Sequence, residues 1–187
     1  MIRIGIDPSI NSTGICIWNT GTNSTLYYLI PSKMTKAMKE FNSNKVIILP
    51  YTKLDPKGQE YSVKENLKFN NIYNISLIIK DIIKKYIGDD IEVYMEGVSY
   101  GSVGSAALVD LSFLNASIRM VLKELEVNFN IISPTQVKKF ACANGQADKD
   151  IMIDAWKRLD KGINDIKGIK IDDLADSYFL SHYQEVK

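Results

Sequence analysis

IRIGID, residues 2–7, is the stretch that decides the fold. It is apolar and β-branched, as expected of a buried strand, and it ends on the carboxylate of Asp7. The turn residues PSINSTG come next, and GICIWN at residues 14–19 has the pattern of a second strand. Residues 2–19 are therefore predicted to form a hairpin that carries Asp7 at the edge of a sheet.

The rest of the chain continues this sheet and covers it with helices. Apolar and aromatic runs predict three more strands, at residues 25–30, 91–96 and 128–132. Helical periodicity and helix-start residues predict helices over residues 62–86, 105–126, 134–140, 148–159 and 172–183. This order predicts an α/β fold, with a mixed five-stranded sheet of three antiparallel strands and two parallel ones, and with helices on both faces.

Residues 31–60 have the least regular pattern. They hold a short helical stretch near residues 34–41, an apolar VIIL at residues 46–49 and a loop around residues 54–58. The sequence has no internal repeat and no low-complexity tract, so residues 1–187 are expected to form one domain.

The composition is that of an ordinary globular protein, with 187 residues, 45% hydrophobic and 24% charged. No apolar run reaches the roughly 18–20 residues that span a bilayer, and the N-terminus lacks the apolar stretch of a signal peptide. Cys16 and Cys142 are far apart and lack CxxC spacing, so we expect reduced thiols in a cytoplasmic protein. His182 is the only histidine, which disfavours a zinc site.

The net charge of +1 is lower than that of many proteins that bind nucleic acids. Basic residues nevertheless cluster in two stretches. One stretch holds Lys33, Lys36, Lys39 and Lys45, and the other holds Lys138, Lys139, Lys149, Lys157, Arg158 and Lys161. A handful of such groups on one face can contact phosphates, although solvated helix faces explain lysine runs equally well.

Four acidic residues have positions that suit metal binding. Asp7 and Glu96 end two predicted strands, and Asp173 and Asp176 share one face of the last predicted helix. Acids in these positions can converge at one edge of a sheet and hold two divalent cations. Because a pair of metal ions promotes in-line phosphoryl displacement, the sequence predicts a metal-dependent nuclease.

Each acid also has a purely structural interpretation. Asp7 could cap the turn that follows it, and Glu96 could reach solvent from the end of its strand. Asp173 and Asp176 could simply stabilise the start of a helix through its dipole. Asp172 competes with Asp173 because it also lies one turn from Asp176, or it could be the N-cap.

These motifs resemble those of the RuvC-type Holliday junction resolvases, which belong to the RNase H-like nuclease superfamily. IGIDPSINSTG, residues 4–14, is similar to the family's opening IGIDPG…TG, and Glu96 to its glutamate at the end of the fourth strand. The closing D-x-x-D-A is matched by DLADS at residues 173–177, with Ser177 in place of alanine. Ser9 replaces a usual glycine, and neither departure removes an acid.

The resemblance covers nearly the whole chain. SPTQVKKF at residues 133–140 and GQADKD at residues 145–150 are similar to the family's stretch of DNA-contacting lysines. Residues 31–60 lie outside the resemblance, and we interpret them as an insertion.

The resemblance implies an RNase H-like fold and a crossover junction endodeoxyribonuclease of DNA recombination and repair. Two Mg²⁺ or Mn²⁺ ions would be held by Asp7, Glu96, Asp173 and Asp176, with Asp7 between them. One ion would activate a water and the other would stabilise the departing 3′-oxygen, which leaves 5′-phosphate and 3′-hydroxyl ends. Lys149 would assist as a donor near the scissile phosphate.

The same resemblance assigns the DNA contacts and the oligomer. Lys138, Lys139 and Lys149 would bind branched DNA, and Tyr100 would be the aromatic residue near the junction centre. Tyr100 lies one residue later than the family pattern, so it could instead be a plain loop aromatic. A four-way junction has two symmetry-related scissile sites, so we expect a homodimer, with its interface on the helix at residues 105–126.

Three other functions remain open from the sequence alone. The chain could be a flap or fork endonuclease with looser selectivity, or a branched-DNA-binding protein without catalysis. An actin-like ATPase or kinase also opens with a strand and an aspartate, but it needs two such lobes and loops richer in glycine. The Ile-, Asn- and Lys-rich usage is typical of an AT-rich genome, and a phage or mobile element is one hypothesis for its source.

Overall fold

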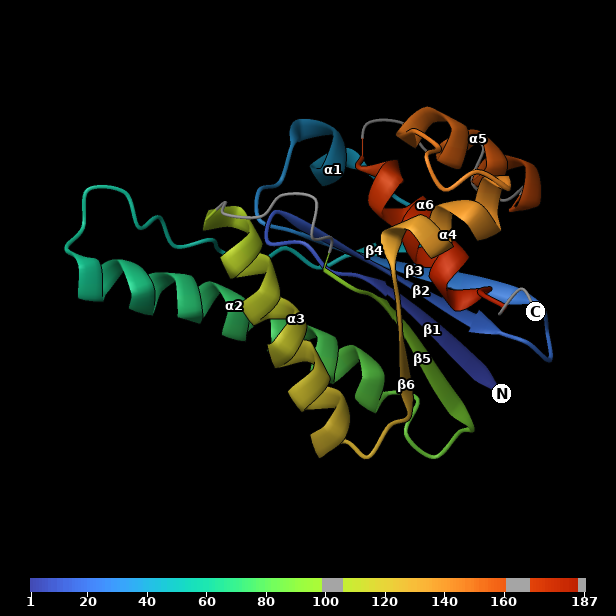
Figure 1. The fold of residues 1–187 in the computed structure, drawn as a ribbon, viewed down its shortest axis with the longest axis horizontal. Coiled ribbons are helices and arrows are strands. Elements are labelled where there is room, and N and C mark those ends of the chain that lie inside the picture. Colours follow the sequence, from blue (N-terminus) through green and yellow to red (C-terminus); the bar gives the residue numbers. More distant parts are fainter. Residues whose placement is uncertain (99–105, 161–168, 185–187) are drawn as a thin grey trace.

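The computed structural model describes residues 1–98, 106–160 and 169–184. Its centre is a six-stranded mixed sheet with the strand order β4-β3-β2-β1-β5-β6 (Figure 1). The strands are β1 (Ile2–Asp7), β2 (Ser12–Asn19), β3 (Ser24–Pro31), β4 (Val46–Ile48), β5 (Ile91–Glu96) and β6 (Phe129–Ile132). The pairs β1–β2 and β2–β3 are antiparallel, whereas β1–β5, β5–β6 and β3–β4 are parallel.

Helices cover both faces of this sheet. They are α1 (Lys36–Glu40), α2 (Tyr61–Lys84), α3 (Ala106–Glu124), α4 (Pro134–Cys142), α5 (Lys149–Leu159) and α6 (Ile171–Ser181). Helices α2 and α3 lie on one side of the sheet, and α4, α5 and α6 lie on the other (Figure 1). The predicted α/β class with helices on both faces is thus confirmed.

The prediction of five strands was wrong by one. The sixth strand, β4, comes from the VIIL stretch, lies at one edge of the sheet and pairs parallel to β3 through only three residues. A strand this short has no alternation from which to recognise it, and its parallel pairing with β3 depends on a contact distant in sequence.

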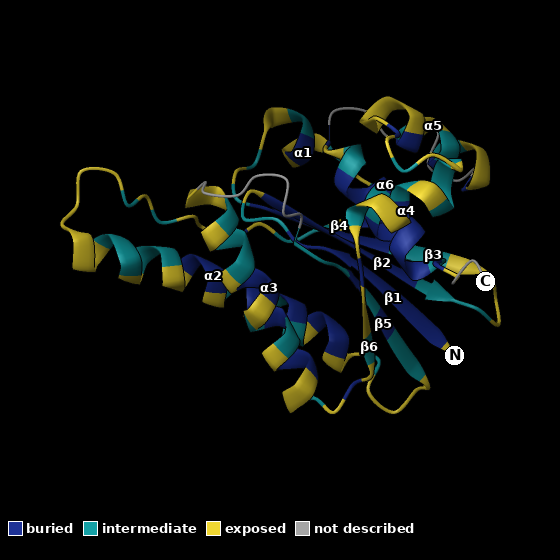
Figure 2. Cartoon of the chain, viewed as in Figure 1, coloured by how far each residue is buried: buried dark blue, intermediate teal, exposed yellow. Residues whose placement is uncertain are grey.

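The alternation of side chains along β1 separates two cores. Ile2, Ile4 and Ile6 are buried in a cluster with residues of α2 and α3. Gly5 faces the opposite way, toward α6. All of β1 is buried (Figure 2), as the apolar pattern of IRIGID predicts.

Two glycines let α6 pack directly on the backbone of the sheet. A Cβ added to Gly5 would overlap the backbone of Ser177 and Ser181, and one added to Gly14 would overlap the carbonyl oxygen of Asp173. Any larger side chain at either glycine would therefore push α6 away from β1 and β2.

Residues 31–60 wrap around the edge of the sheet. Met38 of α1 is buried in the core on the α6 side, whereas Tyr51 is buried in the core on the α2 side. Leu54 is then fixed by Asn71 of α2, whose side chain accepts a hydrogen bond from the Leu54 amide (2.8 Å) and donates one to its carbonyl (2.9 Å).

Among the described residues, no helix is long and apolar enough to cross a membrane.

Candidate functional site

The candidate site begins with the ends of two neighbouring strands. Asp7 is the last residue of β1 and Glu96 is the last residue of β5. The two strands are parallel, with Ile6 opposite Met95, so Asp7 and Glu96 come next to each other at the same edge. The two carboxylates are close enough that the charge of Glu96 raises the pKa of Asp7. The predicted meeting of these two acids is therefore present in the structure.

Helix α6 brings two more acids to this edge. Asp173 lies in its first turn and Asp176 one turn later. Because the backbone of Asp173 packs directly on Gly14, which is opposite Asp7 in the β1–β2 pair, this helix end lies over the end of β1. Both acids are close enough to repel the carboxylate of Asp7. All four acids predicted from the sequence thus gather in one place.

Burial and mutual repulsion raise the pKa values of these acids. The pKa of Asp7 is raised well above its usual range, first by burial and then by the charges of Glu96, Asp176 and Asp173. The pKa of Glu96 is raised to about 7, chiefly by burial and then by Asp176. Burial likewise raises the pKa of Asp173 and that of Asp176 to about 6 each.

The chemistry of this cluster suits a divalent cation. A cation of this kind prefers carboxylate oxygens, and its charge would remove the repulsion among the acids. The Ser12 hydroxyl partly offsets the rise in the pKa of Asp173, yet Asp173 Oδ2 and Ser12 Oγ are buried without a hydrogen-bond partner of normal geometry. A carboxylate oxygen can accept more than one partner, so Asp173 Oδ2 keeps acceptor capacity that a cation could use.

The acids would have to turn toward a cation to bind it. Within the part of the chain that the structure describes, no three Asp, Glu, His or Cys side chains are arranged to hold one metal ion as they stand. The four carboxylates thus fit a divalent cation by their chemistry, once their side chains turn toward it.

The predicted lysines approach the cluster from α4 and α5. Lys138 lies close enough to lower the pKa of Glu96 and that of Asp176. Lys149 forms an ion pair with Asp172 at 2.6 Å, and this pairing raises the pKa of the lysine.

Asp172 is occupied by this pair, and it is not the N-cap of α6, which is Lys170. The alternative of Asp172 as N-cap was therefore wrong. Lys139 is exposed on α4. Tyr100 lies outside the described residues, so its predicted role stays a prediction.

Sequence reasoning missed a residue that supports Glu96. Asn115 of α3 is buried, and its side chain donates a hydrogen bond of 3.0 Å to the backbone carbonyl of Glu96. Arg119 in turn donates to the Asn115 side chain at 2.7 Å. The available signal was a lone asparagine inside the apolar stripe of α3, because a buried amide needs specific partners.

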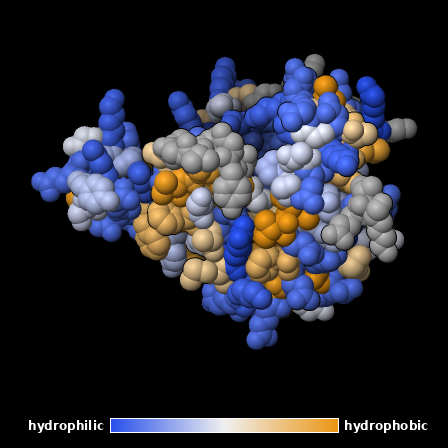
Figure 3. Space-filling view, in the orientation of Figure 1, coloured by the Kyte–Doolittle hydropathy of each residue, from blue (hydrophilic) through white to orange (hydrophobic). Residues whose placement is uncertain are grey.

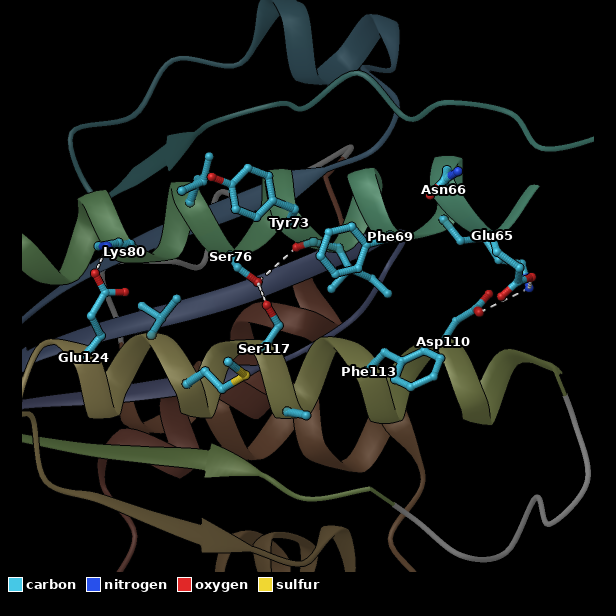
Figure 4. Close-up of a pocket in the computed structure, with 16 residues that line it drawn as sticks. Glu65, Asn66, Phe69, Tyr73, Ser76, Lys80, Asp110, Phe113, Ser117 and Glu124 are labelled. Atoms are coloured by element: carbon cyan, nitrogen blue, oxygen red, sulfur yellow. Dashed lines mark hydrogen bonds and ion pairs between the residues drawn. The ribbon is translucent and has the colours of Figure 1, made fainter. Parts of the chain in front are cut away.

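A second feature is an apolar groove between α2 and α3, on the face of the sheet away from α6 (Figure 4). Its volume is about 840 Å³, and exposed apolar side chains line it, among them Phe69, Phe113 and Met120, which is 72% exposed. Polar links join the two helices along the groove: Lys68 to Asp110, Ser76 to Ser117, and Lys80 to Glu124. Figure 3 shows the apolar side chains that gather over α3.

The order and direction of the strands, with helices on both faces, define an α/β fold of the RNase H-like kind. More narrowly, the fold is of the RuvC type. A Thermus thermophilus RuvC structure matches with a TM-score of 0.58 and 16% sequence identity, over 97% of this chain and 91% of that one. The structure of T. thermophilus RuvC in complex with a Holliday junction substrate matches with a TM-score of 0.59 and 14% identity, over 97% and 90%. No model of a protein family matches the sequence, and no curated protein matches it.

Proposed function

We propose that this protein, residues 1–187 acting as one nuclease domain, is a metal-dependent endonuclease that resolves four-way DNA junctions. The observation that carries the proposal is the gathering of Asp7, Glu96, Asp173 and Asp176 at one sheet edge. The RuvC-type fold supports the choice of DNA, since one of its structural neighbours is a RuvC in complex with a Holliday junction. The placement of Lys138 and Lys149 beside the acids supports a polyanionic substrate.

The four acids would hold two Mg²⁺ or Mn²⁺ ions. When bound, such a pair supplies Lewis-acid activation of a water and stabilises charge on the departing 3′-oxygen. Asp7 and Glu96 keep their places because their backbones belong to paired strands, so little reorganisation of the main chain is needed. The products would be 5′-phosphate and 3′-hydroxyl ends.

The lysines would act on the DNA rather than on the ions. Lys138 is positioned to place positive charge near Glu96 and Asp176, where a phosphate would approach. Lys149 is 75% exposed at its side chain and can exchange Asp172 for a phosphate oxygen. A donor at this point would stabilise charge that develops on the scissile phosphate.

Cleavage of junctions is tested with a substrate panel. Labelled four-way junction, fork, flap and duplex DNA are incubated with Mg²⁺ or Mn²⁺, and the products are resolved on denaturing gels. We expect paired incisions in the junction. Equal cutting of forks or flaps would instead assign a broader branched-DNA nuclease, and binding without cutting would assign a non-catalytic protein.

The role of Asp7 is tested separately from DNA binding. Asp7→Asn removes a buried carboxylate from the cluster, so it should abolish cleavage while junction binding stays the same or tightens. Binding is measured by gel shift in EDTA. Loss of binding together with cleavage would argue against a metal-ligand role for Asp7.

Paired incision implies a second copy of the chain, and we propose that it docks on the groove between α2 and α3. The exposed side chains of Phe113 and Met120 are suited to burial in a two-fold contact. In equilibrium sedimentation, Met120→Asp should shift the dimer toward monomer. The matched variant Leu159→Asp, an exposed apolar residue of α5 outside the groove, should not. A wild-type protein that is monomeric with and without junction DNA would refute the dimer.

A further inference from the structure

Residues 31–60 carry a disproportionate share of the positive charge of the chain. It holds six of the 23 basic residues and three of the 22 acidic ones, so it is net positive while the rest of the chain is net negative. Lys45 is used internally, in an ion pair of 3.0 Å with Asp160. Lys33, Lys36, Lys39, Lys53 and Lys57 are exposed.

The chain between residues 31 and 60 passes twice near the strand ends where the acids lie. Strand β3 ends at Pro31, close to the start of β2 and hence to the end of β1, because Ser12 pairs with Pro31 and Gly14 with Asp7. The chain leaves there through Lys33 and forms α1. It then joins the sheet as β4. Because β4 is parallel to β3, it ends on the same side of the sheet as β3, and Lys53 follows a few residues later.

Hydrogen bonds hold both of these stretches, at Ser32 and at residues 51–53, against the loop that follows Asp7. The Ser32 amide donates to the Asn11 carbonyl at 2.9 Å, and Lys53 Nζ donates to Asn11 Oδ1 at 2.8 Å. The buried Tyr51 hydroxyl donates to the Ile10 carbonyl. Asn11 is four residues from Asp7, so their Cα atoms are at most about 14 Å apart.

Lys33 and Lys53 therefore lie on the opposite side of the acid cluster from Lys138. Lys138 belongs to α4, which follows the edge strand β6, whereas Lys33 and Lys53 lie toward the β3 and β4 side. Successive phosphates of one strand are about 3.4 Å apart along a DNA axis, so 14 Å corresponds to roughly four nucleotides. A strand whose scissile phosphate meets the acids would therefore pass within reach of both groups.

We propose that residues 31–60 form a basic flank, in which Lys33 and Lys53 contact DNA backbone phosphates a few nucleotides from the cut site. This inference rests on the proposed function, because it takes the DNA to be the substrate of the acid cluster. The flank is preformed, since Met38, Tyr51 and the Asn71–Leu54 hydrogen bonds hold it in place without DNA. Such contacts carry no base specificity, and they orient the duplex arm beside the cut.

The test measures how junction affinity depends on salt. Binding of a labelled four-way junction is followed by anisotropy in EDTA from 50 to 200 mM KCl, so that cleavage does not interfere. Each phosphate contact contributes about 0.9 to the slope of log K against log salt, so Lys33→Gln/Lys53→Gln should reduce that slope by about 2. The control Lys84→Gln/Lys123→Gln removes the same charge near the ends of α2 and α3, at the opposite end of the sheet, and should leave the slope unchanged.

The single variant Lys33→Gln separates a loss of phosphate contacts from damage to the fold. Among the described residues Lys33 has no ion-pair partner, so Lys33→Gln should keep the melting temperature and still reduce the slope by about 1. Suppose that wild type cuts the junction. If the flank variants then keep the salt slope of wild type, or if the control variant loses as much slope as they do, the flank is refuted and the proposed function stands. If wild type binds no DNA, both are refuted.

Discussion

Replacing Glu96 by glutamine should stabilise the metal-free protein at neutral pH. Burial and the charge of Asp176 raise the pKa of Glu96 from 4.5 to about 7 in the folded state, whereas the unfolded chain keeps the ordinary value. The folded state therefore binds more protons than the unfolded state between these values, and stability falls as the pH rises from about 4.5 to 7. At pH 7 this penalty is about 3 kcal/mol for Glu96.

The glutamine side chain has a similar shape and carries no charge. The gain should be absent near pH 4.5 and grow to at most about 3 kcal/mol at pH 7 to 8. For a chain of this size, that is an upper bound of about 6–12 °C in melting temperature. Thermal unfolding followed by circular dichroism in EDTA, at intervals from pH 4.5 to 8, measures the difference.

With Mg²⁺ present, the wild type should become more stable than Glu96→Gln. A cation that binds only the folded wild type adds about 4.1 kcal/mol at one thousand times its Kd, which exceeds the gain of about 3 kcal/mol of the variant, and the variant has lost one ligand. Glu92→Gln is the matched control: Glu92 is on the same strand but pairs with Arg3 at 3.6 Å, so its loss should bring no gain. If Glu96→Gln is no more stable than wild type at pH 8 in EDTA, burial and repulsion of the Glu96 carboxylate do not destabilise the folded state.

Two further predictions concern the same edge of the sheet. The apparent affinity for Mg²⁺ should weaken as the pH falls from 8 to 6, because Glu96, Asp173 and Asp176 take up protons there, and calorimetric titrations at several pH values will measure it. Gly14→Ala should destabilise the protein by about 1–3 kcal/mol and impair cleavage, because its Cβ would overlap the backbone of Asp173. In chemical denaturation the control Gly21→Ala should be far milder, since the atom nearest its added Cβ is 3.4 Å away.

The elements that the sequence predicted are those with long or regular patterns. The strand at residues 2–7 and that at residues 91–96 have the predicted bounds, because each is an uninterrupted run between turn residues. Ser133 and Pro134 also begin α4 as expected, with a capping box to Gln136. Periodicity locates such elements because the apolar face of each must be buried.

The features that could not be predicted depend on contacts between distant parts of the chain. Lys149 and Asp172 are 23 residues apart, and nothing in either local pattern indicates that they pair. The Asn115 bond to Glu96 and the docking of Tyr51 on Ile10 are of the same kind. Periodicity shows which face of an element is buried, and it does not show which polar side chain on a neighbouring element will meet it.

The direction of the Asp7 side chain follows from the burial of isoleucines. Ile4 and Ile6 are fully buried on the α2 side, and each contributes about 1.5–3 kcal/mol of hydrophobic free energy. A shift of β1 by one residue would turn both isoleucines toward α6 and place Gly5 in the α2-side core, so this register is strongly disfavoured. The strand alternates strictly, so Asp7 must lie on the α6 face, where burial destabilises its charge. The apolar residues that stabilise the fold thus hold a carboxylate where only a proton or a cation can compensate it.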